Sequence, residues 1–236
     1  MKKILTTLTL LATLSSASEY YSKLNPIHVY DVKSSVSGQV LFVNNEVESQ
    51  KASKSTIVKI DSKVNVEDLK QSKIKLKNLK AILKIEEGTL KSFKRVSSKS
   101  RFDKDNQRVK IFNISSNISD LETKIATLED TIAKKNLIEE DNYIYNIAVE
   151  IGDYVNPGVV LYSSMDLSAG KLEIYIPIDK ATEIQNKSIY LDGIQTDLKI
   201  SKLYTVADST HISSYKCEII VPTPSSFSNL VKIEFK

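Results

Sequence analysis

The sequence predicts an α+β protein in which a long helical hairpin interrupts a small β domain, with further strands behind it. Three observations predict this. Two charged stretches with heptad spacing fill residues 62–140. The segments on either side of them resemble each other at a shift of 104 residues. From Lys171 to the end, short runs alternate between apolar and polar residues, as in half-buried strands.

The chain begins with the pattern of a secretory signal peptide. Lys2 and Lys3 precede an apolar run from Ile4 to Leu14, and small residues follow up to Ala17. We expect cleavage after Ala17, which leaves retention as an anchor as the alternative. The run is too short for a standard membrane span. Cys217, the single cysteine, lies too far away to carry a lipid, so we expect no lipid anchor.

Composition places the rest of the chain among ordinary folded proteins. Hydrophobic residues make up 41% and charged residues 26%, with a formal net charge of +4. This balance gives no reason to expect a nucleic-acid partner.

Residues 18–61 are expected to form a leader and the first β segment. Ser18 to Asn25 reads as a mobile leader, and Ile27 to Val32 alternates like a strand. The next segment and its counterpart after residue 141 form an internal repeat of two strand–turn–strand units. The matching positions are Gly38, Val40, Val43, Asn45 and Ile57 in the first copy and Asn142, Ile144, Ile147, Val149 and Leu161 in the second.

Glycines mark the turns of the second copy. Gly152 and Gly158 follow the pattern of tight turns, because glycine admits positive φ. In the first copy Glu48 and Lys54 occupy those positions, so we expect different turns there.

Two apolar seams define the inserted hairpin. The earlier seam is Leu69, Leu76, Leu83 and Leu90 with Leu79 and Phe93, and the later one is Ile111, Ile118, Ile125 and Ile132 with Ile114, Leu121 and Leu128. A polar run between them offers Asp103 as N-cap of the second helix. An antiparallel hairpin with arms of roughly 50 Å is the simplest solution. A dimerisation rod with the same seams remains the alternative.

The last 69 residues, 168–236, predict a second β domain. Strands are expected at residues 172–176, 188–191, 198–204, 214–221 and 230–235, with a brief helix from Asp179 to Gln185.

The residue types of common catalytic and metal sites are sparse. His28 and His211 each lie alone in a predicted strand, and Met165 is the only methionine after the leader. Cys217 reads as a buried, inert thiol in an alternating strand. We therefore expect no enzyme activity, no cofactor and no metal.

Three features together resemble the periplasmic adaptor, or membrane fusion, proteins (HlyD/RND type) of bacterial tripartite efflux pumps. They are the run Val36–Val40, the run Val149–Gly158 and the hairpin between them. The resemblance implies a biotinyl/lipoyl-like β domain split by an antiparallel coiled-coil hairpin, then a small β-barrel. It divides the chain into a signal peptide (1–17), a leader and first barrel strand (18–35), a half-motif (36–61), the hairpin (62–140), a second half-motif (141–167) and the barrel (168–236).

The resemblance also implies partners. An adaptor without catalytic activity would lie in the periplasm and bridge an inner-membrane exporter, RND type favoured and ABC type second, to an outer-membrane channel. It would assemble into a homo-oligomeric ring, a trimer or hexamer. Two alternatives stay open: a periplasmic coiled-coil protein outside any pump, and an acyl or biotin carrier, although helices occupy the turn where a carrier lysine would sit.

In the family the hairpin tip docks on the channel through an arginine, leucine and serine pattern. Aligned at the N-cap, Asp103 matches the serine, Val96 matches the leucine, and Ser92 stands where arginine is expected. The resemblance thus implies a docking tip made of Arg95, Val96, Lys99, Arg101, Phe102 and Asp103, and turn glycines of the lipoyl-like domain at Gly38, Gly152 and Gly158.

Overall fold

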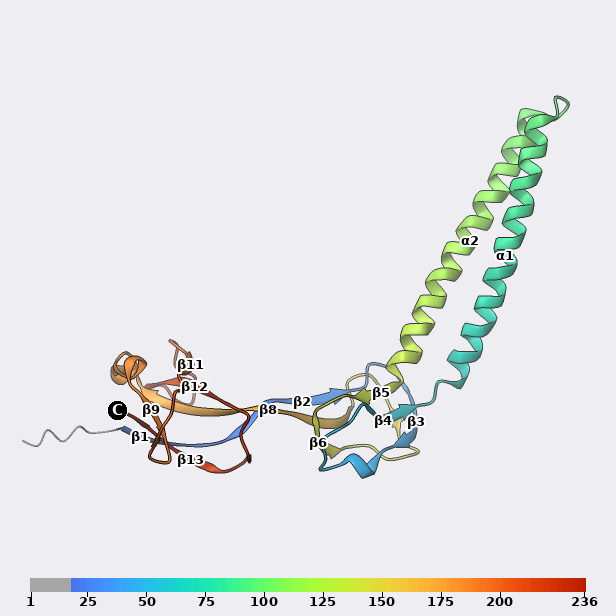
Figure 1. The fold of residues 1–236 in the computed structure, drawn as a ribbon. Helices are drawn as coiled ribbons and strands as arrows, with labels where there is room; N and C mark the ends of the chain where they lie inside the picture. The colour runs from blue at the N-terminus through green and yellow to red at the C-terminus, as the bar shows by residue number, and fades with distance from the viewer. Residues whose placement is uncertain (1–17) are drawn as a thin grey trace, which may run out of the picture. The chain divides into compact units, whose positions relative to one another are not determined.

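The computed structural model describes residues 18–236, so the predicted signal peptide lies outside the described residues. Two long helices and many β-strands confirm the mixed α and β composition (Figure 1). The described chain divides into two compact units. Residues 30–164 form one, called here the hairpin unit, and residues 18–29 with 165–236 form the other, the C-terminal unit.

The hairpin unit is built on a small antiparallel sheet. Its strand order is β5 (Asn136–Glu139), β4 (Ser55–Ile60), β3 (Gly38–Val43) and β7 (Tyr154–Val155), while β6 (Tyr143–Ile147) pairs with the first part of β8 (Val160–Pro177). A 3-10 turn, η1, covers Asn45–Val47. The strands bury one core whose fully enclosed members are Val40, Ile57, Val58, Ile60, Ile144 and Leu161.

The two halves of this core are related as the internal repeat predicts. The amide of Asn44 donates to the carbonyl of Ile57 at 2.9 Å, and that of Ala148 donates to Leu161 at 2.9 Å, which is the same bond 104 residues later. One turn differs from the expectation. Ser49, with φ 63°, takes the left-handed conformation, whereas Glu48 has an ordinary φ of −62°. The first copy thus turns one residue later than the alignment predicts.

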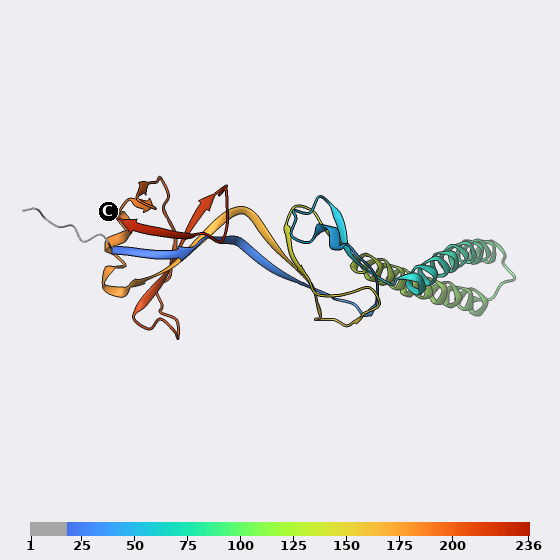
Figure 2. The ribbon, with the colours of Figure 1, turned by 90° about the horizontal axis from the view of Figure 1, so that it is seen from below.

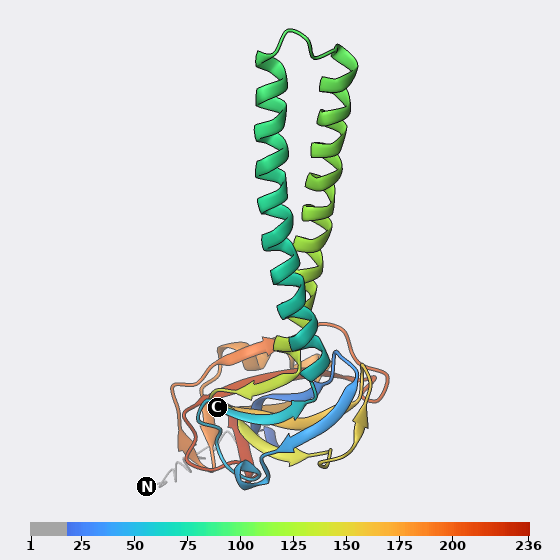
Figure 3. The same cartoon turned by 90° about the vertical axis from the view of Figure 1, so that its right-hand side faces the viewer.

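The two helices leave this sheet and return to it. Helix α1 (Lys63–Arg95) and helix α2 (Arg101–Lys134) lie side by side and run in opposite directions (Figure 3). The expected hairpin end at Glu140 is wrong. Leu137 and Ile138 belong to β5, because the chain after Lys135 pairs along β4 and half-buries Leu137 against the core.

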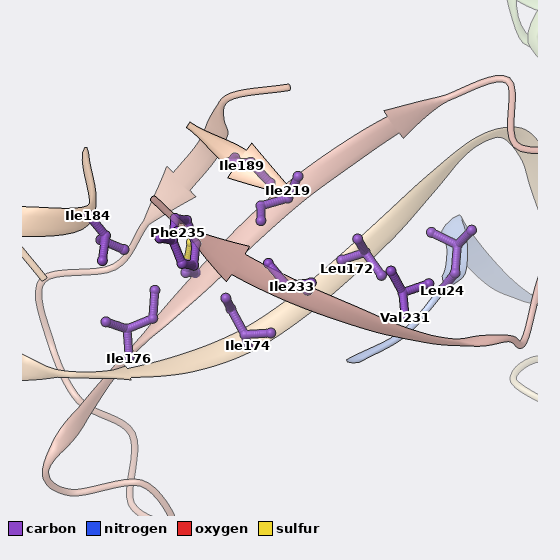
Figure 4. Close-up of a cluster of buried hydrophobic side chains, with 11 residues drawn as sticks. Leu24, Leu172, Ile174, Ile176, Ile184, Ile189, Ile219, Val231, Ile233 and Phe235 are labelled. Carbon is purple, nitrogen blue, oxygen red and sulfur yellow. The ribbon is translucent and has the colours of Figure 1, made fainter. Parts of the chain in front are cut away.

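The C-terminal unit contains two antiparallel sheets. One has the order β1 (Ser18–Lys23), β13 (Leu230–Phe235), β9 (Ile189–Leu191) and β10 (Ile194–Gln195). The other has the order β11 (Ile200–Leu203), β12 (Ser214–Pro222), β8 and β2 (Asn25–Lys33). Apolar side chains from both sheets converge in one core (Figure 4). Two 3-10 turns, η2 (Ile178–Lys180) and η3 (Glu183–Asn186), replace the brief helix predicted there.

Two boundaries differ from the sequence prediction. Ser18–Lys23 is a strand and not a leader, because its six residues pair with β13 (Figures 1 and 2). Its Tyr20 packs edge to face on Phe235. The predicted boundary at residue 168 falls inside β8, which continues unbroken through Ala169 and Gly170. There Leu24 fills the space beside Gly170, where a Cβ would lie 2.6 Å from its Cδ1.

Candidate functional site

The seam between α1 and α2 forms from the residues that the heptad pattern selects. Ile114, Ile118 and Leu121 of α2 are buried, and the leucine column of α1 is half-buried opposite them. Ion pairs flank the seam: Lys73 with Glu129 at 2.6 Å, Lys80 with Glu122 at 2.7 Å, and Lys124 with Asp68 at 3.4 Å. Residue numbers that rise on one helix fall on the other across these pairs, so the helices are antiparallel within one chain.

Polar side chains replace apolar ones near both ends of the seam. Towards the tip, Gln107 donates from Nε2 to the carboxylate of Glu86 at 2.7 Å and to its carbonyl at 2.9 Å. At the base, the buried Lys135 donates from Nζ to the carbonyl of Asp61 at 2.6 Å and to Oδ1 of Asn65 at 2.8 Å. Buried polar groups need their own partners, so these contacts select one register.

The tip is the five-residue connection, residues 96–100, together with the adjoining helix ends. The prediction that Asp103 is the N-cap is wrong, because α2 begins three residues earlier. Ser100 is the N-cap: its Oγ accepts from the amide of Asp103 at 3.0 Å, and Asp103 accepts from the amide of Ser100 at 3.2 Å. Hydrogen bonds from Ser100 hold the pKa of Asp103 below its ordinary value. This reciprocal capping box fixes where the second helix starts.

The tip exposes apolar and basic side chains together. Phe102 is 73% exposed and Val96 47%. The Arg101 side chain is 97% exposed, with Nε 3.7 Å from a carboxylate oxygen of Asp105. The amino group of Lys99 lies 4.6 Å from the ring centroid of Phe93, where a cation is attracted to the ring face. Arg95 ends α1 and is exposed. All six tip residues predicted from the sequence therefore lie within one short stretch of the surface.

Each helix also carries an exposed, uncharged face on the side away from the seam. Its residues repeat with heptad spacing, but they are not the apolar positions from which the seams were predicted. On α1 it comprises Gln71, Ile74, Asn78, Ala81, Ile85, Gly88 and Ser92, and on α2 Val109, Phe112, Ser116, Ser119, Thr123 and Ala126. Five exposed lysines border the α1 face at intervals of seven residues: Lys63, Lys70, Lys77, Lys84 and Lys91.

The predicted turn glycines lie at tight points of the hairpin unit. Gly152 and Gly158 have φ of 104° and 94°, the left-handed region where side chains are strained. Gly38 is needed for space instead, because a Cβ there would lie 2.6 Å from Cγ2 of the buried Ile60. Lys54, the counterpart of Gly158, has φ 48° and so makes the same turn without glycine.

Reactive groups are few in the described part of the chain. Cys217 is buried, and its burial raises the pKa of the thiol to about 12. His211 lies in a loop and not in the predicted strand, because Asp208 accepts from its backbone amide at 2.6 Å and its ring stacks on Tyr175. No group of three or more metal-ligating side chains occurs among residues 18–236.

Sequence comparisons do not identify this chain. No family model matches it, and no curated protein matches it. The fold, in contrast, matches solved structures over nearly all of its length. MacA from Actinobacillus actinomycetemcomitans matches with a TM-score of 0.71 at 17% identity, over 93% of this chain and 78% of that one.

This chain has the fold of the membrane fusion proteins. The membrane fusion protein Spr0693 from Streptococcus pneumoniae R6 matches with a TM-score of 0.71 at 8% identity, over 93% of this chain and 98% of the other. A putative efflux transporter from Bacteroides eggerthii DSM 20697 matches with a TM-score of 0.64 at 14% identity, over 93% and 68%. The resemblance to the membrane fusion proteins that the half-motifs and the hairpin predict is thus confirmed at the level of the overall fold, at identities too low for sequence comparison to detect. Within residues 18–236 we find no helix long and apolar enough to cross a membrane.

Proposed function

We propose that this chain is a periplasmic adaptor subunit without catalytic activity, which bridges an inner-membrane exporter and an outer-membrane channel in a tripartite efflux pump. The observation that carries the proposal is the insertion of one antiparallel helix pair between two repeated halves of a single β core. Such a core closes only when both ends of the insertion meet, so the helices must project as one arm of roughly 50 Å.

Under this proposal residues 36–61 and 141–167 form the split lipoyl-like domain, and residues 168–236 with β2 form the barrel that contacts the exporter. The helix pair is a coiled-coil hairpin. An exporter of the RND type is favoured. An ABC type comes second and stays open, because nothing in the sequence reads the exporter's energy source. The predicted signal peptide directs the chain to the periplasm.

The tip is the proposed contact with the channel. Arg95, Lys99 and Arg101 supply positive charge, while Val96 and Phe102 supply apolar area, and Asp103 fixes the helix start. Exposed aromatic and arginine side chains are the types that dominate protein interfaces. The rigid capping box lowers the entropy that docking would cost.

The uncharged helix faces support the proposed ring. The α1 face is bordered by the lysine column, and the α2 face by the exposed Asp120. Placing α1 of one copy against α2 of the next would set this carboxylate near the lysine column and bury two uncharged faces. Because the two faces differ, the contact is heterologous and closes into a ring and not an isologous dimer.

Deletion and tip substitutions test the proposal. Deleting the gene should lower tolerance to exported compounds, and the chain purified from membranes should bring an exporter and a channel with it. Arg95→Glu with Arg101→Glu should lower tolerance as deletion does, at unchanged protein level. The matched control, Arg95→Lys with Arg101→Lys, keeps the charge and should keep tolerance.

The outcomes separate two ideas. If the charge-reversal variant tolerates the compounds as well as the parent, in a strain where deletion has an effect, the tip does not dock as proposed. If deletion has no effect and neither partner copurifies, the adaptor function itself fails.

The second candidate is a periplasmic coiled-coil protein that dimerises outside any pump. The ion pairs within one chain favour the hairpin over this reading. Cysteines introduced by Lys80→Cys and Glu122→Cys, joined by a short bismaleimide, should give intramolecular products. Exclusively intermolecular products would support the dimer rod.

A further inference from the structure

One end of the C-terminal unit presents aliphatic side chains to solvent. Val206 is 80% exposed and Ile212 78%, at the two ends of the loop that joins β11 to β12. Ile178, at the start of η2, is 43% exposed, and its amide donates to the carbonyl of Ser213 at 3.2 Å. These three residues are called the aliphatic tip. None of them enters the proposed contacts of the helix pair.

The loop that carries the aliphatic tip is held in shape from inside. The carboxylate of Asp208 accepts from the amides of Thr210 at 2.8 Å and His211 at 2.6 Å, and it also bonds the His211 ring. That ring stacks on Tyr175 with centroids 3.4 Å apart and an interplanar angle of 15°. The loop therefore does not hide its two aliphatic side chains by collapsing onto the unit.

Charge at this end is low and balanced. The only acidic residue among positions 205–213 is Asp208, and its carboxylate is occupied by the loop's own donors. Next to the loop, the exposed Asp179 and Lys180 offset each other. Burial of this surface in an apolar phase would thus remove few unpaired charges from water.

The N-terminal end of the described chain enters the unit here. Ser18 begins β1, and its hydroxyl accepts from Nζ of Lys180 in η2 at 3.3 Å. The apolar run Ile4–Leu14 ends four residues before Ser18, a gap that spans at most roughly 14 Å of extended chain. An apolar run preceded by lysines partitions to membranes. Until it is cleaved, or throughout if it is kept, this run holds Ser18 within that distance of a bilayer. The sequence therefore delivers this end of the unit to a bilayer surface.

We infer that the aliphatic tip inserts into the interface of a lipid bilayer and holds this end of the C-terminal unit against the membrane. Val206 and Ile212 enter the boundary between headgroups and acyl chains. Insertion depends on aliphatic area and not on attraction to anionic lipids, so it persists at high salt. One copy binds weakly, and a ring of copies would bind more tightly through avidity.

The absence of tryptophan from the chain allows a direct test. A single reporter introduced by Ile212→Trp in the full chain is mixed with vesicles of phosphatidylethanolamine and phosphatidylglycerol. We expect its emission to shift to the blue and to be quenched at least about twofold by acyl-brominated lipid, in low and in 1 M salt alike. Leu230→Trp is the matched control, because Leu230 is 69% exposed and pairs with Lys23 at the other end of β1 and β13.

A second measurement tests membrane insertion without the introduced tryptophan, which could itself bind lipid. In the unmodified chain, amide hydrogen exchange across residues 205–213 should slow on the same vesicles, and Val206→Ser with Ile212→Ser should abolish the slowing. The inference is overturned if the emission of Ile212→Trp does not change on vesicles, or if brominated lipid quenches Ile212→Trp and Leu230→Trp equally. A silent reporter that responds only to a purified membrane protein would assign the surface to a protein partner and overturn it too. Failure here leaves the proposed efflux role untouched, since that role is read out by tolerance and copurification.

Discussion

The seam of the helix pair and the cores of the two β units are built from the same residue types, but they exclude water to different degrees. In the β units Ile57, Ile144 and Ile219 are fully enclosed. In the seam the most buried apolar residues, Ile114, Ile118 and Leu121, remain 8–9% exposed. Two helices alone cannot enclose a residue on all sides, whereas strands from two sheets or two repeated halves can. The helix pair therefore depends on its β base for stability.

Both regions bury polar groups. The helix pair and its base hold Ser72, Gln107 and Lys135 among their buried residues, and the β units hold Ser22, Ser34, Ser164, Glu218 and Glu234. Polar contacts in a seam fix register at a cost in stability. The contacts of Gln107 and Lys135 thus define the alignment of the helix pair.

Matched isoleucine truncations should give the largest difference. Ile57→Ala opens a cavity in an enclosed core and should lower the free energy of unfolding by about 4 kcal/mol. Ile118→Ala removes the same atoms from a seam that water can reach, and should cost about 2 kcal/mol. Urea unfolding followed by circular dichroism measures both. An equal or larger loss for Ile118→Ala would contradict the comparison.

Glycine substitutions should differ in sign. Gly38→Ala forces a Cβ against Cγ2 of Ile60 at 2.6 Å and should destabilise the chain by about 2 kcal/mol. Gly88→Ala lies on an exposed face of α1 with no atom within 4 Å, and should stabilise by about 0.5–1 kcal/mol because alanine favours helix. Thermal melts of the two variants beside the parent check this. Destabilisation by Gly88→Ala would show that this face is already packed against a partner.

The reaction rates of two buried thiols, one in the C-terminal core and one in the seam, should show how often each region opens to solvent. Cys217 in the C-terminal core should react with a thiol reagent at pH 8 at least about 100-fold more slowly than in urea, because it is enclosed. A thiol placed in the seam by Ser72→Cys, in a Cys217→Ser background, should react at least about tenfold faster than Cys217. Comparable rates would mean that the helix pair opens no more readily than the β core.

The Cys217 thiol also gives a pH dependence. Its pKa in the folded chain is raised to about 12, above that of an unfolded thiol, so the unfolded state releases its proton first. The stability it contributes is complete below about pH 8.5 and is lost as pH rises towards 12. Cys217→Ala should flatten the alkaline limb of stability in that window.

The sequence predicts long periodic features well and local geometry poorly. The seven-residue spacing from Leu69 to Leu90 and from Ile111 to Ile132 predicts both helices, because many positions repeat one requirement. Helix ends follow single contacts instead: Ser100 became the N-cap because the capping box with Asp103 satisfies two amides. Strand β1 was missed because its pairing with β13 joins residues more than 200 positions apart, beyond any local signal.

The candidate sites divide in the same way. The six tip residues could be named because the break in the heptads marks a turn and the family resemblance assigns docking to that turn. The turn glycines could be named from the same resemblance and from their residue type. The aliphatic tip could not, since Val206 and Ile212 are ordinary residues of a strand-rich segment until the loop exposes them. Position Ser49 was missed because a serine can adopt φ 63° without any mark in the sequence.

Lys135 gives the helix pair the mechanics of a lever. It follows α2 directly, its carbonyl accepts from the amide of Ile60 at 2.8 Å, and its amino group is bonded to Asp61 and Asn65 where α1 starts. Lys135 thus links the ends of both helices at the base, so the two helices tilt together. With an arm of roughly 50 Å, a tilt of about 5° at this point displaces the far end by about 4 Å. Small changes in the orientation of the β base therefore produce displacements of several ångströms at the tip of the hairpin.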